Sequence, residues 1–165
     1  MKPSAAHRVT AAVEVAASPQ RVWEVVSDIT VMPQLSTELL SVEWAEGWTG
    51  PRLGAQFLGR NRNPVIGEWT TRSQIIAYEP PRLFGWSVGD PEKPAANWVF
   101  ELQPSADRTR LRYTAEIGPG PSGVTMLIER SPERAEQIID GRLAQFRKAV
   151  VATLAGVRDR AETGR

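Results

Sequence analysis

The stretch SPERAEQIIDGRLAQFRKAVVATLA, residues 131–155, decides the fold, because it predicts one long amphipathic helix. Ser131 is a favourable cap, and Pro132 suits the first helical turn, where its missing N–H leaves no hydrogen bond unmade. Gly156 is the expected end of the helix. The apolar side chains recur at steps of three and four residues and therefore form one stripe. The stripe consists of Ala135, Ile139, Leu143, Phe146, Val150, Leu154 and Val157.

The other face of this helix carries charged and amide side chains, among them Arg142 and Gln145, and we expect it to face solvent. At 1.5 Å per residue the helix is about 35 Å long, so a short partner segment cannot cover its apolar stripe. A broad surface elsewhere in the chain must pack against it.

Strands in the preceding part of the chain supply such a surface. Seven segments alternate apolar and polar residues with a period of two, which is typical of strands with one solvated and one covered face. They are residues 8–16, 39–46, 55–62, 68–77, 83–88, 97–103 and 110–117. In the second of them, Leu40, Val42 and Trp44 are expected to share one face.

Two short helices are predicted between the first two strands, the first opened by Ser18 and Pro19 and the second over residues 32–35. The order of elements predicts an α+β fold, in which a curved seven-stranded antiparallel sheet wraps around the long C-terminal helix. We assign residues 8–158 to a single domain, and residues 1–7 and 159–165 to flexible termini.

Composition excludes several classes of function. Lys and Arg total 20 and Asp and Glu total 19, a formal net charge of +1, so no basic field indicates a nucleic-acid partner. The chain has no cysteine and a single histidine, His7, so we expect neither a metal site nor a cofactor. No apolar run is long enough to span a membrane or typical of a signal peptide. We therefore expect a cytoplasmic protein without stable membrane insertion.

Four motifs resemble one family. They are VAASPQRVW at residues 15–23, Ser27-Asp28, GEWTT at residues 67–71 and YEPPR at residues 78–82. Together they look like the SRPBCC superfamily, which has the helix-grip fold, and within it like the polyketide cyclase/dehydrase and lipid-transport group. The resemblance covers about residues 8–158. It implies a cavity for a small hydrophobic ligand between sheet and helix. Leu35 departs from the pattern, because relatives often have Trp there, at the cavity mouth.

Bulky rings dominate the predicted concave face of the sheet. So many rings facing one helix indicate either packed core or a deep apolar pocket with a few polar groups. The predicted ligand-binding residues are Trp44, Phe57, Trp69, Thr71, Ser73, Trp86, Trp98, Phe100, Tyr113, Met126, Ile139 and Leu143.

Three functions remain open at this point. The first is binding or transport of a small hydrophobic or aromatic molecule, such as a lipid or a polyketide-like compound. The second is a metal-free cyclase, aromatase or dehydratase, in which Tyr113, Thr71 or an arginine near the cavity mouth polarises a carbonyl or moves a proton. The third, less favoured because outward residues such as Arg72 and Arg110 are polar, is a cochaperone-type interaction module. A homodimer is compatible with all three.

The segment 118–130 connects the last strand to the long helix. Its Pro and Gly residues predict an irregular loop, yet it contains Val124, Met126 and Ile128. We expect it either to plug one end of the core or to act as a lid, with Gly118 and Gly120 among the hinges.

Overall fold

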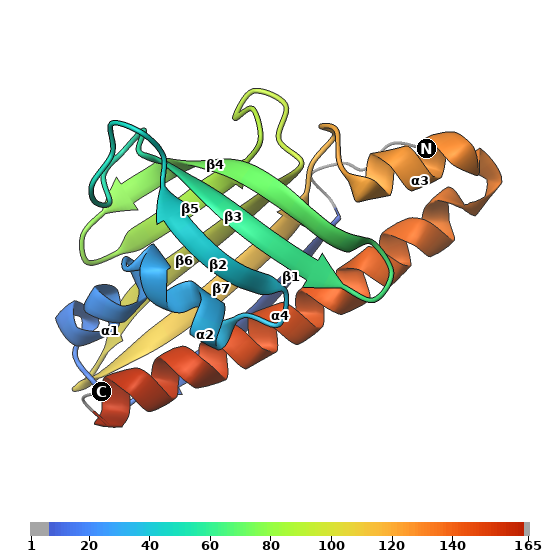
Figure 1. Cartoon of the computed structure of the whole chain (residues 1–165). Helices are drawn as coiled ribbons and strands as arrows, with labels where there is room; N and C mark the ends of the chain where they lie inside the picture. Colours follow the sequence, from blue (N-terminus) through green and yellow to red (C-terminus); the bar gives the residue numbers. More distant parts are fainter. Residues whose placement is uncertain (1–6, 164–165) are drawn as a thin grey trace.

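The computed structural model describes residues 7–163 and contains one antiparallel sheet whose strand order is β1-β7-β6-β5-β4-β3-β2. This arrangement confirms the predicted α+β fold. The sheet curves around α4, which crosses its concave side (Figure 1). The strands are β1 (Arg8–Val15), β2 (Leu39–Trp44), β3 (Gln56–Asn63), β4 (Gly67–Glu79), β5 (Leu83–Val88), β6 (Ala96–Ser105) and β7 (Arg108–Ile117).

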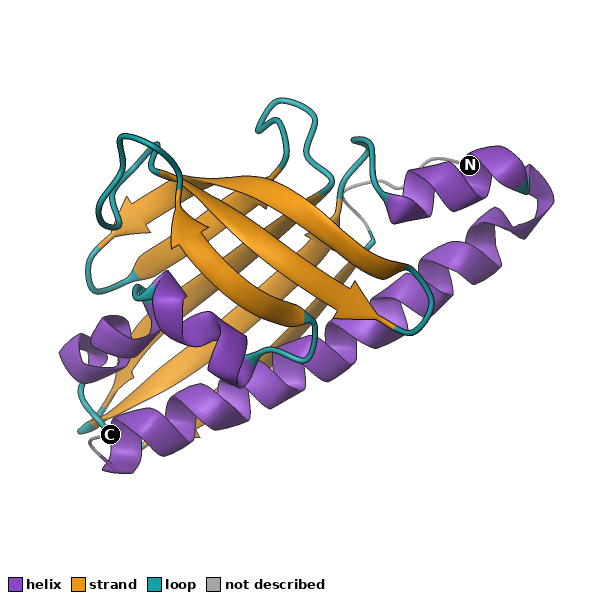
Figure 2. Cartoon of the chain, viewed as in Figure 1, coloured by secondary structure: helices purple, strands orange, loops and turns teal. Residues whose placement is uncertain are grey.

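Helices occupy two parts of the chain (Figure 2). Two short helices follow β1, as the sequence predicts, with a 3₁₀ turn between them, and the other helices follow β7. The elements are α1 (Pro19–Val26), η1 (Ile29–Val31), α2 (Met32–Leu35), α3 (Gly123–Arg130), η2 (Pro132–Arg134) and α4 (Ala135–Thr163). None of the helices in residues 7–163 is long and apolar enough to cross a membrane.

The bounds of the long helix differ from the prediction at both ends. Its start is delayed because Pro132 opens the 3₁₀ turn η2, and the side chain of Ser131 makes no cap hydrogen bond. The helix also continues beyond Gly156 through residues 159–163, which the sequence analysis assigned to a flexible terminus. Glu162 fixes this last turn by accepting a hydrogen bond from the Ala16 backbone N–H at 2.7 Å. Residues 1–6 and 164–165 lie outside the described part of the chain.

Gly156 serves close packing instead of helix termination. A Cβ atom at this position would lie 2.7 Å from Cδ2 of Leu35 in α2, which is closer than real carbon contacts. Leu35 therefore rests against α4 and does not line the cavity described below, contrary to the position that the family resemblance implies.

The segment 118–130 is not an irregular loop, because residues 123–130 form α3. Ser122 and Thr125 start this helix with a reciprocal capping box: Thr125 N–H donates to Ser122 Oγ at 3.2 Å and Ser122 N–H donates to Thr125 Oγ1 at 2.8 Å. Two of the predicted hinge glycines are held against the β5–β6 loop. Gly118 N–H donates to the Ala95 carbonyl at 2.9 Å, and Gly120 N–H donates to the Pro94 carbonyl at 2.8 Å.

The inward and outward faces of β2 also differ from the prediction. A bulge between Leu39 and Ser41 shifts the register against β3, which reverses the alternation at that point. Leu39 consequently faces the interior, whereas Leu40, predicted to share a face with Val42, is 38% exposed.

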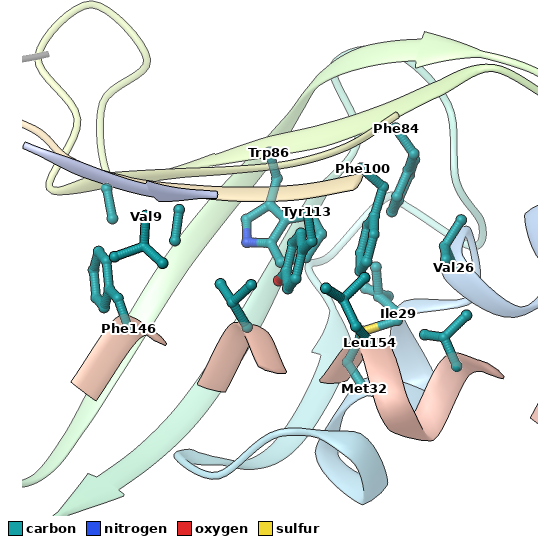
Figure 3. Close-up of a cluster of buried hydrophobic side chains, with 14 of the residues drawn as sticks. Val9, Val26, Ile29, Met32, Phe84, Trp86, Phe100, Tyr113, Phe146 and Leu154 are labelled. Carbon is teal, nitrogen blue, oxygen red and sulfur yellow. The ribbon is translucent and has the colours of Figure 1, made fainter. Parts of the chain in front are cut away.

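The core fills the space between the sheet, α1 and one end of α4. Its fully buried side chains include Phe84 and Phe100 from the sheet, Val26 from α1 and Leu154 from α4. Figure 3 shows these side chains beside Trp86 and Tyr113, which extend the cluster along the sheet. The apolar stripe predicted for the long helix forms the side of this core that faces the sheet.

Candidate functional site

A cavity of about 560 Å³ lies beyond this core, between the concave face of the sheet and α4. Strands β3 to β7 form its floor, Phe146 and Ala149 of α4 form one wall, and the chain around α2 and β2 completes the wall beside α4. The start of α3, including Val124 and Met126, covers one end. This volume is within the range of sites that hold small organic molecules.

Eight of the twelve predicted ligand-binding side chains line this cavity. All but one of them are inward-pointing side chains of the strands, and the remaining one belongs to α3. They are Phe57, Trp69, Thr71, Ser73, Trp86, Trp98, Tyr113 and Met126. Strand alternation therefore brings together most of the expected wall.

The other four predicted residues pack elsewhere and do not line the cavity. Trp44 packs edge-on against Phe57, with ring centroids 6.2 Å apart. Phe100 is fully buried, and its ring stacks on Tyr113 with centroids 3.8 Å apart. Ile139 is buried in the core, and the half-buried side chain of Leu143 packs against this core. None of these four side chains is among the residues that line the cavity, although they were predicted to contact a ligand.

Tyr113 supplies a hydroxyl group to the cavity. Its side chain is 4% exposed, and its oxygen forms no hydrogen bond within residues 7–163. No fully buried side-chain oxygen or nitrogen in this range lacks a partner, so the Tyr113 oxygen lies on the cavity surface. Figure 3 shows it pointing away from β7 towards α4. Burial raises the pKa of this phenol far above its ordinary value, which keeps the proton in place.

Two other predicted polar side chains face the same space. Ser73 is buried on β4, and Thr71 lies two residues earlier on the same inward face. Thr71 Oγ1 accepts a hydrogen bond of 3.3 Å from Asn61 Nδ2 on β3. The cavity thus contains neutral hydroxyl and amide groups among its aromatic rings.

An ion pair in the cavity wall was not predicted from the sequence. Arg142 of α4 and Glu38, which precedes β2, both line the cavity, and each side chain is 12% exposed. Arg142 NH1 donates to Glu38 Oε2 at 2.6 Å, and NH2 donates to Oε1 at 3.1 Å. The expectation that Arg142 faces solvent is therefore wrong, because the sheet edge reaches this side of the helix.

One sequence pattern does indicate that the face of α4 carrying Arg142 is buried. Arg142, Ala149, Thr153 and Gly156 recur at helical spacing, and three of them are small, which is typical of a helix face approached closely by another segment. Thr153 Oγ1 donates to the Leu35 carbonyl at 3.4 Å on the same side. A line of small residues beside an apolar stripe thus indicates a second buried face.

A second cavity of about 500 Å³ lies outside the first, between the β3–β4 hairpin, α3 and α4. Ile66, Val124 and Arg142 line both spaces and form the partition between them. No group of three or more His, Asp or Glu side chains in residues 7–163 is arranged to hold a metal ion.

These features agree with the comparison with known protein families. The family described as polyketide cyclase/dehydrase and lipid transport matches residues 6–151, which is most of the chain. The chain therefore belongs to this SRPBCC family, whose members bind hydrophobic ligands or act as polyketide cyclases. No curated protein matches the chain significantly.

Several solved structures share the fold. A polyketide-cyclase-like protein from Corynebacterium glutamicum is 29% identical with a TM-score of 0.67, and the match covers 96% of this chain and 93% of that one. The Zhui aromatase/cyclase from a Streptomyces species is 24% identical with a TM-score of 0.64, covering 94% and 93%. The di-domain aromatase/cyclase StfQ of the steffimycin pathway is 12% identical with a TM-score of 0.67, covering 96% of this chain and 51% of that one.

Proposed function

We propose that this protein binds and carries a small hydrophobic or aromatic molecule in the cavity between the sheet and α4. The observation that carries the proposal is the wall itself: Phe57, Trp86, Trp98 and Phe146 surround a volume of about 560 Å³, with neutral hydroxyl groups between them. Apolar walls with a few polar groups are typical of small-molecule sites. The family to which the chain belongs supports a ligand of this kind.

Trp69→Ala tests the cavity as the binding site. Trp69 is half-buried on the wall and is not part of the main core cluster. We expect its loss to weaken binding of the neutral fluorescent dye Nile red roughly tenfold, because removing an aromatic wall removes apolar contact area. The measurement is a fluorescence titration, with a thermal melt of each protein alongside.

Trp48→Ala is the matched control. Trp48 lies in the β2–β3 connection, stacked on Arg52 at 4.8 Å, and does not line the cavity. Equal dye affinities in both variants would contradict binding in this cavity. A loss of about 3–5 kcal/mol in stability of Trp69→Ala, with dye affinity retained, would identify Trp69 as packed core.

Tyr113 favours a second candidate function, a polyketide cyclase, aromatase or dehydratase. A protonated hydroxyl on the cavity surface that has no hydrogen-bond partner among residues 7–163 is able to donate a hydrogen bond to a ligand carbonyl and to polarise it. Catalysis requires a donor of this kind, whereas a carrier does not.

Tyr113→Phe separates the two functions, because only the hydroxyl is removed. For an enzyme we expect Nile red binding to remain and turnover of a cyclisable polyketone to fall roughly a hundredfold. Product formation is followed by chromatography with mass detection. Equal turnover by the two proteins would exclude Tyr113 as the proton donor.

A further inference from the structure

Among residues 7–163, four charged side chains border the main cavity, and two of these four are largely buried. Glu68 and Arg72 are exposed at its rim. Glu38 and Arg142, at 12% exposure each, carry opposite charges and form a salt bridge with each other. The buried charge in the cavity wall therefore sums to zero.

Both carboxylate oxygens of Glu38 accept hydrogen bonds. Its Oε1 accepts from Arg142 NH2, and its Oε2 accepts both from Arg142 NH1 and from Asn63 Nδ2, the last at 3.1 Å. Arg142 NH1 uses its second hydrogen on Gln145 Oε1 at 2.6 Å. A bidentate pair with additional donors is the geometry in which partly desolvated charges are held without a large net cost.

Asn63 keeps the carboxylate in place. Its Oδ1 accepts the backbone N–H groups of Val65 and Ile66 at 3.0 and 2.7 Å, which orients Nδ2 towards Glu38. The pair is thus supported by the β3–β4 hairpin as well as by α4.

The cation also contacts the aromatic wall. The Arg142 guanidinium lies 4.6 Å from the Phe146 ring centroid and 5.7 Å from that of Trp69, and all three side chains line the cavity. A ligand in contact with these rings lies within the field of Arg142. Without Glu38, this cation would attract an anionic group on the ligand.

We infer that Glu38 is a built-in counter-ion that makes the cavity select uncharged ligands. The inference rests on the proposed binding function and narrows its ligand class to neutral apolar or aromatic molecules, with ketone, ester or hydroxyl oxygens as their polar groups. An anionic ligand would have to place its charge beside the Glu38 carboxylate or displace that carboxylate from Arg142. Glu38 is a specificity-determining residue in this assignment, and Arg142 and Asn63 position it.

The test compares a naphthoate with its methyl ester, two ligands of nearly equal shape that differ in charge at neutral pH. We expect the wild-type protein to bind the ester more tightly. In Glu38→Gln the Arg142 charge is no longer neutralised, so the ratio of acid affinity to ester affinity should rise tenfold or more, roughly the gain from one charge-assisted hydrogen bond. Isothermal titration calorimetry or quenching of tryptophan fluorescence measures both affinities.

Two variants serve as controls for Glu38→Gln. Glu43→Gln removes an equal charge from the exposed face of β2 and should leave the ratio unchanged. The double variant Glu38→Gln/Arg142→Gln removes both charges. Its ratio of acid affinity to ester affinity should therefore return to that of the wild-type protein, whose wall charges cancel. An unchanged ratio in folded Glu38→Gln overturns the inference.

Arg142→Gln provides an independent test if Glu38→Gln does not fold. It leaves Glu38 as the unneutralised charge, so preference should shift roughly tenfold towards naphthylmethylamine, a cation, over naphthylmethanol. No shift in this variant counts against the inference in the same way. Failure of the wild-type protein to bind either the ester or the alcohol would instead remove the proposed function, whereas binding of the ester with unchanged ratios removes only the charge selectivity.

Discussion

A chain that ends at residue 130 is expected to lose cooperative folding and to aggregate. The truncation removes α4, whose Ile139, Phe146, Val150 and Leu154 are buried against the sheet and α1. Burial of each such side chain is worth about 1.5–3 kcal/mol, so four of them approach the whole free energy of unfolding of an ordinary domain, about 5–15 kcal/mol. The exposed concave face of the sheet would then present its rings to solvent.

Size-exclusion chromatography and thermal melts followed by circular dichroism measure this outcome. The control is a chain that ends at residue 163, which retains all of α4 and should melt like the full-length protein. A monomeric chain of residues 1–130 with a sharp melting transition would show that the sheet folds without the helix it surrounds.

Phe100→Ala is expected to reduce the free energy of unfolding by about 3–5 kcal/mol, as for other large-to-small changes of a fully buried aromatic residue. The Phe100 ring is fully buried and lies 3.8 Å from the Tyr113 ring and 6.3 Å from that of Trp86, measured between centroids. Its removal leaves a void behind the cavity wall. Urea denaturation of the variant and the wild type gives the difference.

The same measurement distinguishes core from cavity. The sequence pattern predicts the same ligand-contacting role for Phe100 as for Trp86, because both point inward. A loss below about 1 kcal/mol, together with weaker ligand binding, would return Phe100 to the cavity wall. A large loss of stability, with Nile red affinity retained in the folded variant, supports the position of Phe100 in the core.

Strand pairing explains why so much of the site was predictable. Successive side chains of a strand alternate between the two faces of a sheet, whatever the remainder of the chain does. The inward positions of Phe57, Ser73, Trp98 and Tyr113 therefore follow from local spacing alone. The apolar stripe of the long helix follows in the same way from its period of 3.6 residues.

Local rules were insufficient where capping, bulges and close packing compete. The capping box of Ser122 and Thr125 starts a helix in a segment whose glycines and prolines predict a loop. The bulge after Leu39 reverses the face of Leu40. The alternation of the residues before a bulge does not indicate that an extra residue follows. Gly156 continues a helix because the contact with Leu35 requires a small residue there.

Sequence by itself determined the fold class, the family and the face on which most strand residues lie, because these depend on short-range periodicity and on motifs. Only the tertiary structure decided which inward side chains line open space and which, like Phe100, are covered by neighbours. It also decided the pairing of Glu38 with Arg142 across 104 positions. Charge at a single position carries no information about its partner, so such a pair exists only once the curved sheet has brought its far edge against α4.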